Sequence, residues 1–348
     1  MANLETQILD GIIDKSRRKL LTLGGAAIAG LALAGSTKAA HAATYSDSDI
    51  LNFALNLEYL EANFYYLAAF GCTIDKPNAA ALAAGAPSAG IPITGSVGTP
   101  GTVTATGTTK VPFGTDVTIA SYCNETAIEE GKHVLFLQAA LSSAAVAQPA
   151  INLDVAAGGA WPTLATAAGI PGGSGFSPYT SDLNFLVGAY VFEDVGVTAY
   201  HGAASLLTVS GNLSAAAGIL AVEAYHAGLV RTSITLNDPN ATSIGAYTVM
   251  ISNLRATLAK AGLLGVAPSA YDANPDDYGT ATTTVSIGGS SYPATRIVDA
   301  DPTNEYAFAR NTTQVLNIVT GGGAVSGTTV VSPAKGVFFP AGMNGLFK

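Results

Sequence analysis

Two short motifs constrain this chain more than any other feature of its sequence. Glu130 and His133 form one Glu-x-x-His sequence, and Glu223 and His226 form a second. A spacing of three residues places the two side chains on one face of an α-helix, one turn apart. A single motif is a weak signal, because ion pairs on helix surfaces produce it often. Two copies in separate helical segments predict a polar site inside a helical protein.

Two further glutamates complete the pattern. Glu58 and Glu193 each lie in apolar sequence, so the order along the chain is Glu, Glu-x-x-His, Glu, Glu-x-x-His. Tyr65 follows Glu58 by seven residues, and Tyr200 follows Glu193 by the same distance. Because seven residues make two helical turns, each tyrosine is placed to hydrogen-bond a carboxylate across the pseudo-twofold of the pattern. The alternative is that both are core aromatics with a polar tip.

The scarcity of charge makes this placement informative. Only 11% of the 348 residues are charged, against about 25% in an ordinary soluble domain. After residue 42 the chain has eight glutamates, and seven of them lie in segments expected to be helical, with all three remaining histidines. Lys and Arg number 15 against 24 Asp and Glu, which gives a net charge of -9. Without a basic patch to neutralise phosphates, we expect no nucleic-acid partner.

The helical segments are defined by their length, their apolar period and their end signals. They predict an all-α core built as a four-helix bundle, within a domain that spans residues 43–262. The four bundle helices are expected at 46–70, 119–147, 181–207 and 214–236, with a fifth packing helix at 241–261.

Long irregular segments interrupt and follow this bundle. Residues 73–117 are rich in Gly, Pro, Thr and Ala and too long for a plain connection between bundle helices. They predict an insertion with a β-hairpin near 102–111, and residues 148–180 form a second irregular connection. The extension at 263–348 is expected to hold strands near 282–287 and 328–331 and a short helix near 306–319.

The first 42 residues have the pattern of a secretory signal. Arg17 and Arg18 open a basic sequence, an uncharged stretch follows at 22–37, and Ala40-His41-Ala42 forms a cleavage site of the A-x-A type. The adjacent arginines resemble the twin-arginine type, which exports folded proteins; an ordinary secretory signal or an uncleaved anchor is the alternative. We expect an exported protein, in the periplasm or outside the cell, with no membrane span after the signal.

The ligand order resembles that of the ferritin-like superfamily, whose bundles bind two iron or two manganese ions. Residues 51–58 together with Tyr65 are similar to the first helix of bacterioferritins, which favours Glu58 as a ligand. Glu61, one turn further on the same face, stays open as the alternative. A closer resemblance, to the exported desiccation-related family, rests on the tail segments 295–301, 307–310, 313–319 and 336–345.

The resemblance implies a dinuclear metal site. Four carboxylates neutralise the charge of two divalent ions, whereas without metal the buried carboxylates repel one another. Tyr65 and Tyr200 are expected to orient the ligands. The metal ligands are expected to be Glu58, Glu130, His133, Glu193, Glu223 and His226. Of the neighbouring polar residues, we expect His201 to pack in the core, Glu125, Glu129 and Asp194 to be solvated or capping, and Arg231 to pair with a ligand or lie at the surface.

Two cysteines lie at neighbouring ends of the first two bundle helices. In an exported protein Cys72 and Cys123 are expected to form a disulfide. Closing a loop of about 50 residues stabilises a fold by roughly 4 kcal/mol in the chain-entropy model. The alternative is two buried free thiols.

Three functions are compatible with these residues. The first is a di-iron site that oxidises iron(II) or reduces dioxygen or peroxide. The second is a dimanganese site that disproportionates hydrogen peroxide, because oxygen-rich ligation suits manganese as well as iron. The third is a stress-protective or structural protein that is no enzyme. The insertion and the extension depart from cage ferritins and argue against a hollow iron-storage shell.

Overall fold

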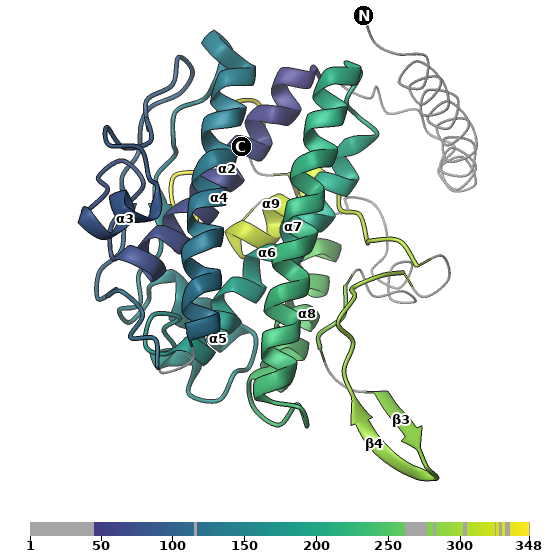
Figure 1. Ribbon diagram of the computed structural model, residues 1–348. Helices are drawn as coiled ribbons and strands as arrows, with labels where there is room; N and C mark the ends of the chain where they lie inside the picture. The colour runs from purple at the N-terminus through teal and green to yellow at the C-terminus, as the bar shows by residue number, and fades with distance from the viewer. Residues whose placement is uncertain are drawn as a thin grey trace, which may run out of the picture. The chain divides into compact units, whose positions relative to one another are not determined.

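Four long helices carry the residues singled out above. In the computed structural model they are α2 (Asp47–Phe70), α4 (Val117–Leu141), α6 (Asp182–Ala204) and α7 (Ser210–Asn237). Figure 1 shows α4 and α7 running side by side along the near side of the bundle. The structure describes residues 45–114, 117–261, 277–280, 283–301, 305–323, 325–326, 329–330 and 335–347. The predicted signal peptide and residues 263–276 of the predicted extension lie outside these ranges.

The bundle is built from two antiparallel pairs of helices. Asn52, early in α2, donates a hydrogen bond to the carbonyl of Ala144 just beyond α4, at 2.9 Å. Further along α2, the Tyr59 hydroxyl accepts a hydrogen bond from Gln138 at 2.8 Å. Residue numbers therefore rise along α2 as they fall along α4. Helices α6 and α7 form the second pair, joined by residues 205–209. The predicted all-α core is confirmed.

Side chains set the first and last turns of α2. Ser46 accepts a hydrogen bond from the Asp49 amide, and the Asp49 carboxylate accepts one from the Ser46 amide, which forms a capping box. Gly71 ends the helix in a left-handed conformation, with φ of 72°. Helix α6 starts in a similar way, because the Ser181 hydroxyl accepts a hydrogen bond from the Asn184 amide. Both predicted start positions are confirmed.

Asp47 links the starts of α2 and α7. Its carboxylate accepts hydrogen bonds from the amides of Thr208 and Val209 and from the side chain of Asn212, at 2.9, 3.1 and 2.9 Å. These bonds favour the charged form and hold the pKa of Asp47 well below its usual range. Because this carboxylate caps α7 from another helix, α7 begins at Ser210, earlier than the predicted residue 214.

Helix α4 ends earlier than predicted. It stops at Leu141 instead of residue 147, and a short 3₁₀ turn follows, in which Ser142 has a positive φ of 50°. The side chain of Asn52 supplies the reason. Its Oδ1 accepts a hydrogen bond from the Val146 amide at 2.9 Å and so holds this segment in an extended conformation.

The insertion contains a short helix, α3 (Ala79–Ala84), and packs against the second irregular connection. The hairpin predicted near 102–111 is wrong. Instead, β1 (Val103–Thr104) pairs in parallel with β2 (Ile151–Asn152), far along the chain. Gly101 permits this approach, because a Cβ at its position would lie 2.1 Å from the Ala150 amide nitrogen. The second connection also carries α5 (Ala160–Ala167).

The C-terminal region adds helices and small hairpins. Helix α8 (Ile244–Ala261) confirms the fifth predicted helix, and the hairpin of β3 (Thr283–Ile287) and β4 (Ser290–Ala294) confirms a predicted strand. The last predicted helix is shorter than expected, because Asn311 caps α9 (Thr312–Thr320) in a capping box with Gln314. The remaining strands are β5 (Val325–Ser326) and β6 (Thr329–Val330), the second of which falls within the predicted strand at 328–331.

A buried ion network fastens the C-terminal residues to the bundle. Arg231 on α7 and Arg255 on α8 both bind Asp194 on α6, at 2.9 and 3.1 Å. Arg255 also binds Asp277 at 2.8 Å, and Arg310 binds the same carboxylate at 2.7 Å. The expectation of a solvated Asp194 is therefore wrong, and Arg231 pairs with this carboxylate and not with a predicted ligand. Charges this deeply buried are stable only when they are paired.

Among the described residues, α7 is long and apolar enough to cross a membrane, with a mean hydropathy of 1.4. The sequence predicts no membrane span after the signal. Helix α7 meets the test for a span by its length and composition only. Its buried side chains include Glu223, His226 and Arg231, which contact polar groups of other helices. We interpret α7 as a core helix.

Candidate metal centre

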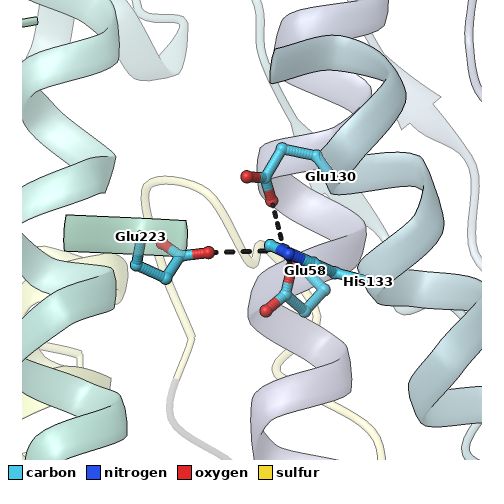
Figure 2. A group of neighbouring side chains, drawn as sticks. All are labelled: Glu58, Glu130, His133 and Glu223. Atoms are coloured by element: carbon cyan, nitrogen blue, oxygen red, sulfur yellow. Dashed lines mark ion pairs between the residues drawn. The ribbon is translucent and has the colours of Figure 1, made fainter. Parts of the chain in front are cut away.

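The structure brings all six predicted ligands together inside the bundle. Glu58 comes from α2, Glu130 and His133 from α4, and Glu223 from α7. Each offers one ligand atom, and these four atoms lie within 4.8 Å of one another. Figure 2 shows the Glu58, Glu130 and Glu223 carboxylates gathered around the His133 ring. Nδ1 of His133 lies 3.3 Å from Glu58, 3.5 Å from Glu130 and 3.4 Å from Glu223.

A second group adjoins the first. Glu130, Glu193 of α6 and His226 of α7 also have ligand atoms within 4.8 Å of one another. Nδ1 of His226 lies 3.0 Å from Glu130 and 3.5 Å from Glu193. Glu130 thus belongs to both groups and lies between the two imidazoles. This is the arrangement that two neighbouring cations require, with a shared carboxylate and separate histidines.

Two tyrosines cross-link the cluster. The Tyr65 hydroxyl on α2 donates a hydrogen bond to Glu193 on α6, and the Tyr200 hydroxyl on α6 donates one to Glu58 on α2. Each tyrosine therefore serves the glutamate of the opposite helix, as the repeated spacing of seven residues predicts. Both hydroxyls are buried, and these bonds fix the direction of the two carboxylates.

The charges of the cluster are coupled. Burial is the main cause that raises the pKa of Glu58 to about 7 and the pKa of Glu223 well above its usual value. Glu130 is buried too, but its pKa is lowered by His133 and His226, because the two imidazoles flank it. Burial opposes the charge on both imidazoles, yet the surrounding carboxylates raise their pKa far above the usual range. Protons and imidazolium groups thus balance the carboxylates here, which is the task that cations perform in a metal site.

The donor atoms fit a metal. Buried polar atoms in proteins nearly always have a hydrogen-bond partner, yet several atoms of this cluster have none. Such atoms are ordinarily costly to bury, and their convergence on one point is what a ligand set for cations requires. They are Oε2 of Glu58, Oε2 of Glu61, both carboxylate oxygens of Glu130, Nδ1 of His133, Oε2 of Glu193, both carboxylate oxygens of Glu223 and Nδ1 of His226.

Glu129 has a role that the sequence interpretation missed. Its Oε2 lies 2.8 Å from Nε2 of His226, so this residue is neither merely solvated nor a cap. A carboxylate on one ring nitrogen leaves the other, Nδ1, for the cluster. The partner lies on another helix, so no spacing along the chain could have revealed it. His201 packs as expected, with Nδ1 3.1 Å from the carbonyl of Phe308, and Glu125 is exposed.

Glu58 and Glu61, the two alternative ligands from α2, both lie at the cluster. Glu61 is buried and forms a third group with Glu130, Glu193 and Glu223, with ligand atoms within 4.8 Å. Glu58 and Glu61 are therefore not exclusive alternatives in space. Glu58 faces His133, whereas Glu61 faces the other carboxylates.

A shallow groove lies at the surface between α4 and α7, and His133 is the predicted ligand that lines it. It has a volume of about 570 Å³, and Lys132, His133 and Phe136 of α4 line it opposite Gly218 and Val222 of α7. The side chain of His133 is 11% exposed, whereas those of Glu130 and Glu193 are fully buried. His133 is thus the ligand of the first group that borders this groove.

Both cysteines are free, so the predicted disulfide is not formed in the structure. Cys72 is half-buried just beyond α2, where its thiol accepts a hydrogen bond from the Asn78 amide. Cys123 is fully buried within α4, close to Lys110. Burial raises the pKa of both thiols, which keeps them protonated.

Comparisons with known proteins agree with this architecture. A family model described as "Ferritin-like domain" matches residues 46–236. The desiccation-related protein PCC13-62 of Craterostigma plantagineum is 33% identical over 226 residues, which cover 63% of this chain and 64% of the relative. The match thus spans less than two thirds of the relative's length. No solved structure matches the chain.

Proposed function

The chain belongs to the family of ferritin-like domains, and on that premise we propose that its buried cluster binds two metal ions, iron in preference to manganese, and oxidises iron(II) or reduces dioxygen or peroxide. The observation that carries the proposal is the convergence of buried carboxylate and imidazole atoms from four helices. The resemblances expected from the sequence, to the ferritin-like superfamily and to desiccation-related proteins, are both confirmed.

The two groups suggest how the ligands divide. Glu58 and His133 would hold one ion, and Glu193 and His226 the other. Glu130 belongs to both groups and would lie between the ions. Glu223 would join it there, because it contacts His133 and shares a group with Glu193. Imidazole together with carboxylate is a donor set that suits iron.

When bound, an iron pair would supply two electrons, one from each ion, which matches the two-electron reduction of peroxide. The protein's own residues then have three tasks. Tyr65 and Tyr200 hold Glu193 and Glu58 in place through their hydroxyls. Glu129 orients His226. The buried helices keep bulk water away from the donor atoms, which strengthens every electrostatic interaction among them.

The biological setting is part of the proposal. One relative is named for desiccation, and removal of iron(II) or peroxide is the protective role that we propose. The twin-arginine pattern at Arg17 and Arg18 supports export of a folded, metal-loaded protein. We therefore place the activity in the periplasm or outside the cell.

Manganese is the second candidate, and the number of carboxylates favours it. Five buried glutamates gather at the cluster against two histidines, and oxygen-rich ligation suits manganese. Such a site would disproportionate hydrogen peroxide without a reductant. Peroxide loss measured with and without an electron donor separates the two chemistries, since only the iron proposal requires the donor.

Metal analysis tests the proposal directly. Protein without a metal-affinity tag, purified from cells supplied with iron and manganese, should hold about two ions per chain by elemental analysis. The double variant Glu130→Ala, Glu223→Ala should hold none, while Glu125→Ala, an exposed glutamate on α4, should match the wild type. A metal-free wild type would overturn both redox proposals and leave a stress-protective or structural role.

A further inference from the structure

Glu61 is a buried carboxylate that the expected set of ligands does not include. Glu61 is 6% exposed, and its Oε2 atom has no hydrogen-bond partner. One of its carboxylate oxygens lies within 4.8 Å of ligand atoms of Glu130, Glu193 and Glu223. A carboxylate in this position needs a positive partner, because burial and its neighbours both oppose its charge.

The two halves of the bundle differ at this position. Glu58 and Tyr65 on α2 correspond to Glu193 and Tyr200 on α6, with the same spacing of seven residues. Three residues after Glu58 stands Glu61, whereas three residues after Glu193 stands a glycine, Gly196. At this position α2 therefore carries a carboxylate, whereas the corresponding position of α6 has no side chain.

Gly196 provides the space that this carboxylate and Glu223 occupy. A Cβ at Gly196 would lie 2.3 Å from Oε2 of Glu223 and 3.8 Å from Oε1 of Glu61. Any larger residue would push Glu223 away from the cluster. A glycine in the middle of a helix costs about 1 kcal/mol in helix propensity. At Gly196 the packing of the two carboxylates explains why a glycine is present.

The surroundings of Glu61 on its other side are apolar. It borders a cavity of about 40 Å³ whose lining includes Leu57, Leu60 and Val195. Arg255 also lines this cavity, but its guanidinium is already paired with Asp194 and Asp277. Arg255 is the basic residue among the described lining of this cavity, so the lining supplies no unpaired cation and the charge of Glu61 can be balanced at the cluster.

We propose that Glu61 is a fifth carboxylate ligand of the metal pair, placed on the side that Gly196 leaves open. This inference rests on the proposed function, because it assigns a further ligand to the same site. Four carboxylates balance two divalent ions, so the fifth adds a negative charge that favours ions of higher charge. Glu61 thus makes the site asymmetric and stabilises the oxidised form of the pair relative to the reduced form.

Cobalt(II) is a suitable probe, since it is a divalent ion that is stable in air and coloured in protein sites. It would be titrated into metal-free wild type, Glu61→Gln and the control Glu125→Gln, with binding followed by calorimetry and visible absorption. We expect two ions per chain in the wild type and the control, and a loss of at least about tenfold in affinity for one ion in Glu61→Gln.

The outcomes separate the two levels of the proposal. Equal affinity in Glu61→Gln and wild type would overturn the role of Glu61 and leave the dinuclear site standing. A wild type that takes up no cobalt would overturn both. Thermal unfolding of the metal-free proteins controls for folding, because glutamine keeps the shape of glutamate and removes a repelling charge, so this variant should be no less stable than the wild type.

A second measurement tests the asymmetry of charge. In the iron-loaded protein, Glu61→Gln should raise the reduction potential, because a negative ligand that stabilises the oxidised ions is lost. The control Glu125→Gln should leave the potential unchanged. An unchanged potential in Glu61→Gln would show that Glu61 has only a packing role.

Discussion

Tyr65 on α2 donates its buried hydroxyl to Glu193 on α6, so a residue of one half of the bundle orients a ligand of the other half. In the same way, the Tyr200 hydroxyl on α6 donates a hydrogen bond to Glu58 on α2. The cluster is therefore held by a crossed pair of hydrogen bonds as well as by the packing of its helices. Loss of one bond should disturb the opposite half of the site more than the half that carries the mutation.

The variant Tyr65→Phe tests this crossing. It leaves the Glu193 carboxylate without its donor, and we expect metal affinity to fall by about 10–100-fold. The effect should concentrate on the ion near His226, because Glu193 lies beside that ring. Cobalt binding measured by calorimetry checks the result. Tyr45→Phe, at a partly exposed tyrosine outside the cluster, is the control and should bind as the wild type does.

The position of Glu130 in both groups gives a second prediction. Glu130→Ala should lose both ions, whereas Glu58→Ala should retain about one ion per chain, because Glu58 belongs only to the group around His133. Elemental analysis after dialysis measures both stoichiometries. Equal retention in the two variants would contradict the shared role of Glu130.

The stability of the metal-free fold should fall as pH rises, and the stabilisation by bound metal should grow over the same range. Burial raises the pKa of Glu58 from 4.5 to about 7, so its protonated form is favoured in the fold. The metal-free fold should therefore lose stability as pH rises from about 4.5 to 7. The imidazoles of His133 and His226, whose pKa is also raised, extend this loss above pH 7.

Bound cations replace those protons, so the gain in melting temperature on adding metal should increase with pH over the same range. Differential scanning calorimetry at several pH values, with and without cobalt(II), measures both trends. A metal-free protein that becomes more stable between pH 5 and pH 8 would contradict the assignment of the charges.

Gly196→Ala should disrupt the site through packing alone. The new methyl group would lie 2.3 Å from Glu223, so we expect a loss of metal affinity of at least about tenfold. Gly228→Ala on α7 is the matched control, because nothing lies within 4 Å of its Cβ position. That control should gain up to about 1 kcal/mol in unfolding free energy. Urea unfolding and cobalt titration of both variants provide the comparison.

Asp194→Asn should weaken the whole fold. Asp194 binds both Arg231 and Arg255, so its loss leaves two buried guanidinium groups short of negative charge. We expect the free energy of unfolding to fall by about 3–5 kcal/mol, measured by urea unfolding of the metal-free protein. Asp182→Asn, at the start of α6 and away from this network, should change it far less.

The sequence predicted the bundle and the residues of the cluster because both are repeated locally. Glu130–His133 and Glu223–His226 each occupy a single helical turn, and the helix of each motif is long and apolar. No role was predicted for Gly196, whose close approach to Glu223 appears only in the folded chain. Its meaning depended on Glu223, which lies on another helix.

The features that the sequence did not predict depend on contacts between distant residues. Helix α4 ends early because Asn52 of α2 binds the segment that follows it. The strand β1 pairs with β2 across the two irregular connections, where no hairpin signal applies. Asp194 and Arg231 are each polar residues on apolar helices, and only the folded chain shows that they meet. Such pairings are fixed by tertiary packing, which local pattern does not encode.

The contact between Asn56 and Asn344 has a consequence for synthesis. The Asn56 side chain donates a hydrogen bond to the Asn344 carbonyl and accepts one from its amide, across 288 residues of sequence. At about 5–20 residues per second, the ribosome makes the second partner roughly 15–60 s after the first. The first helix of the bundle therefore completes its packing only after residue 344 has been made.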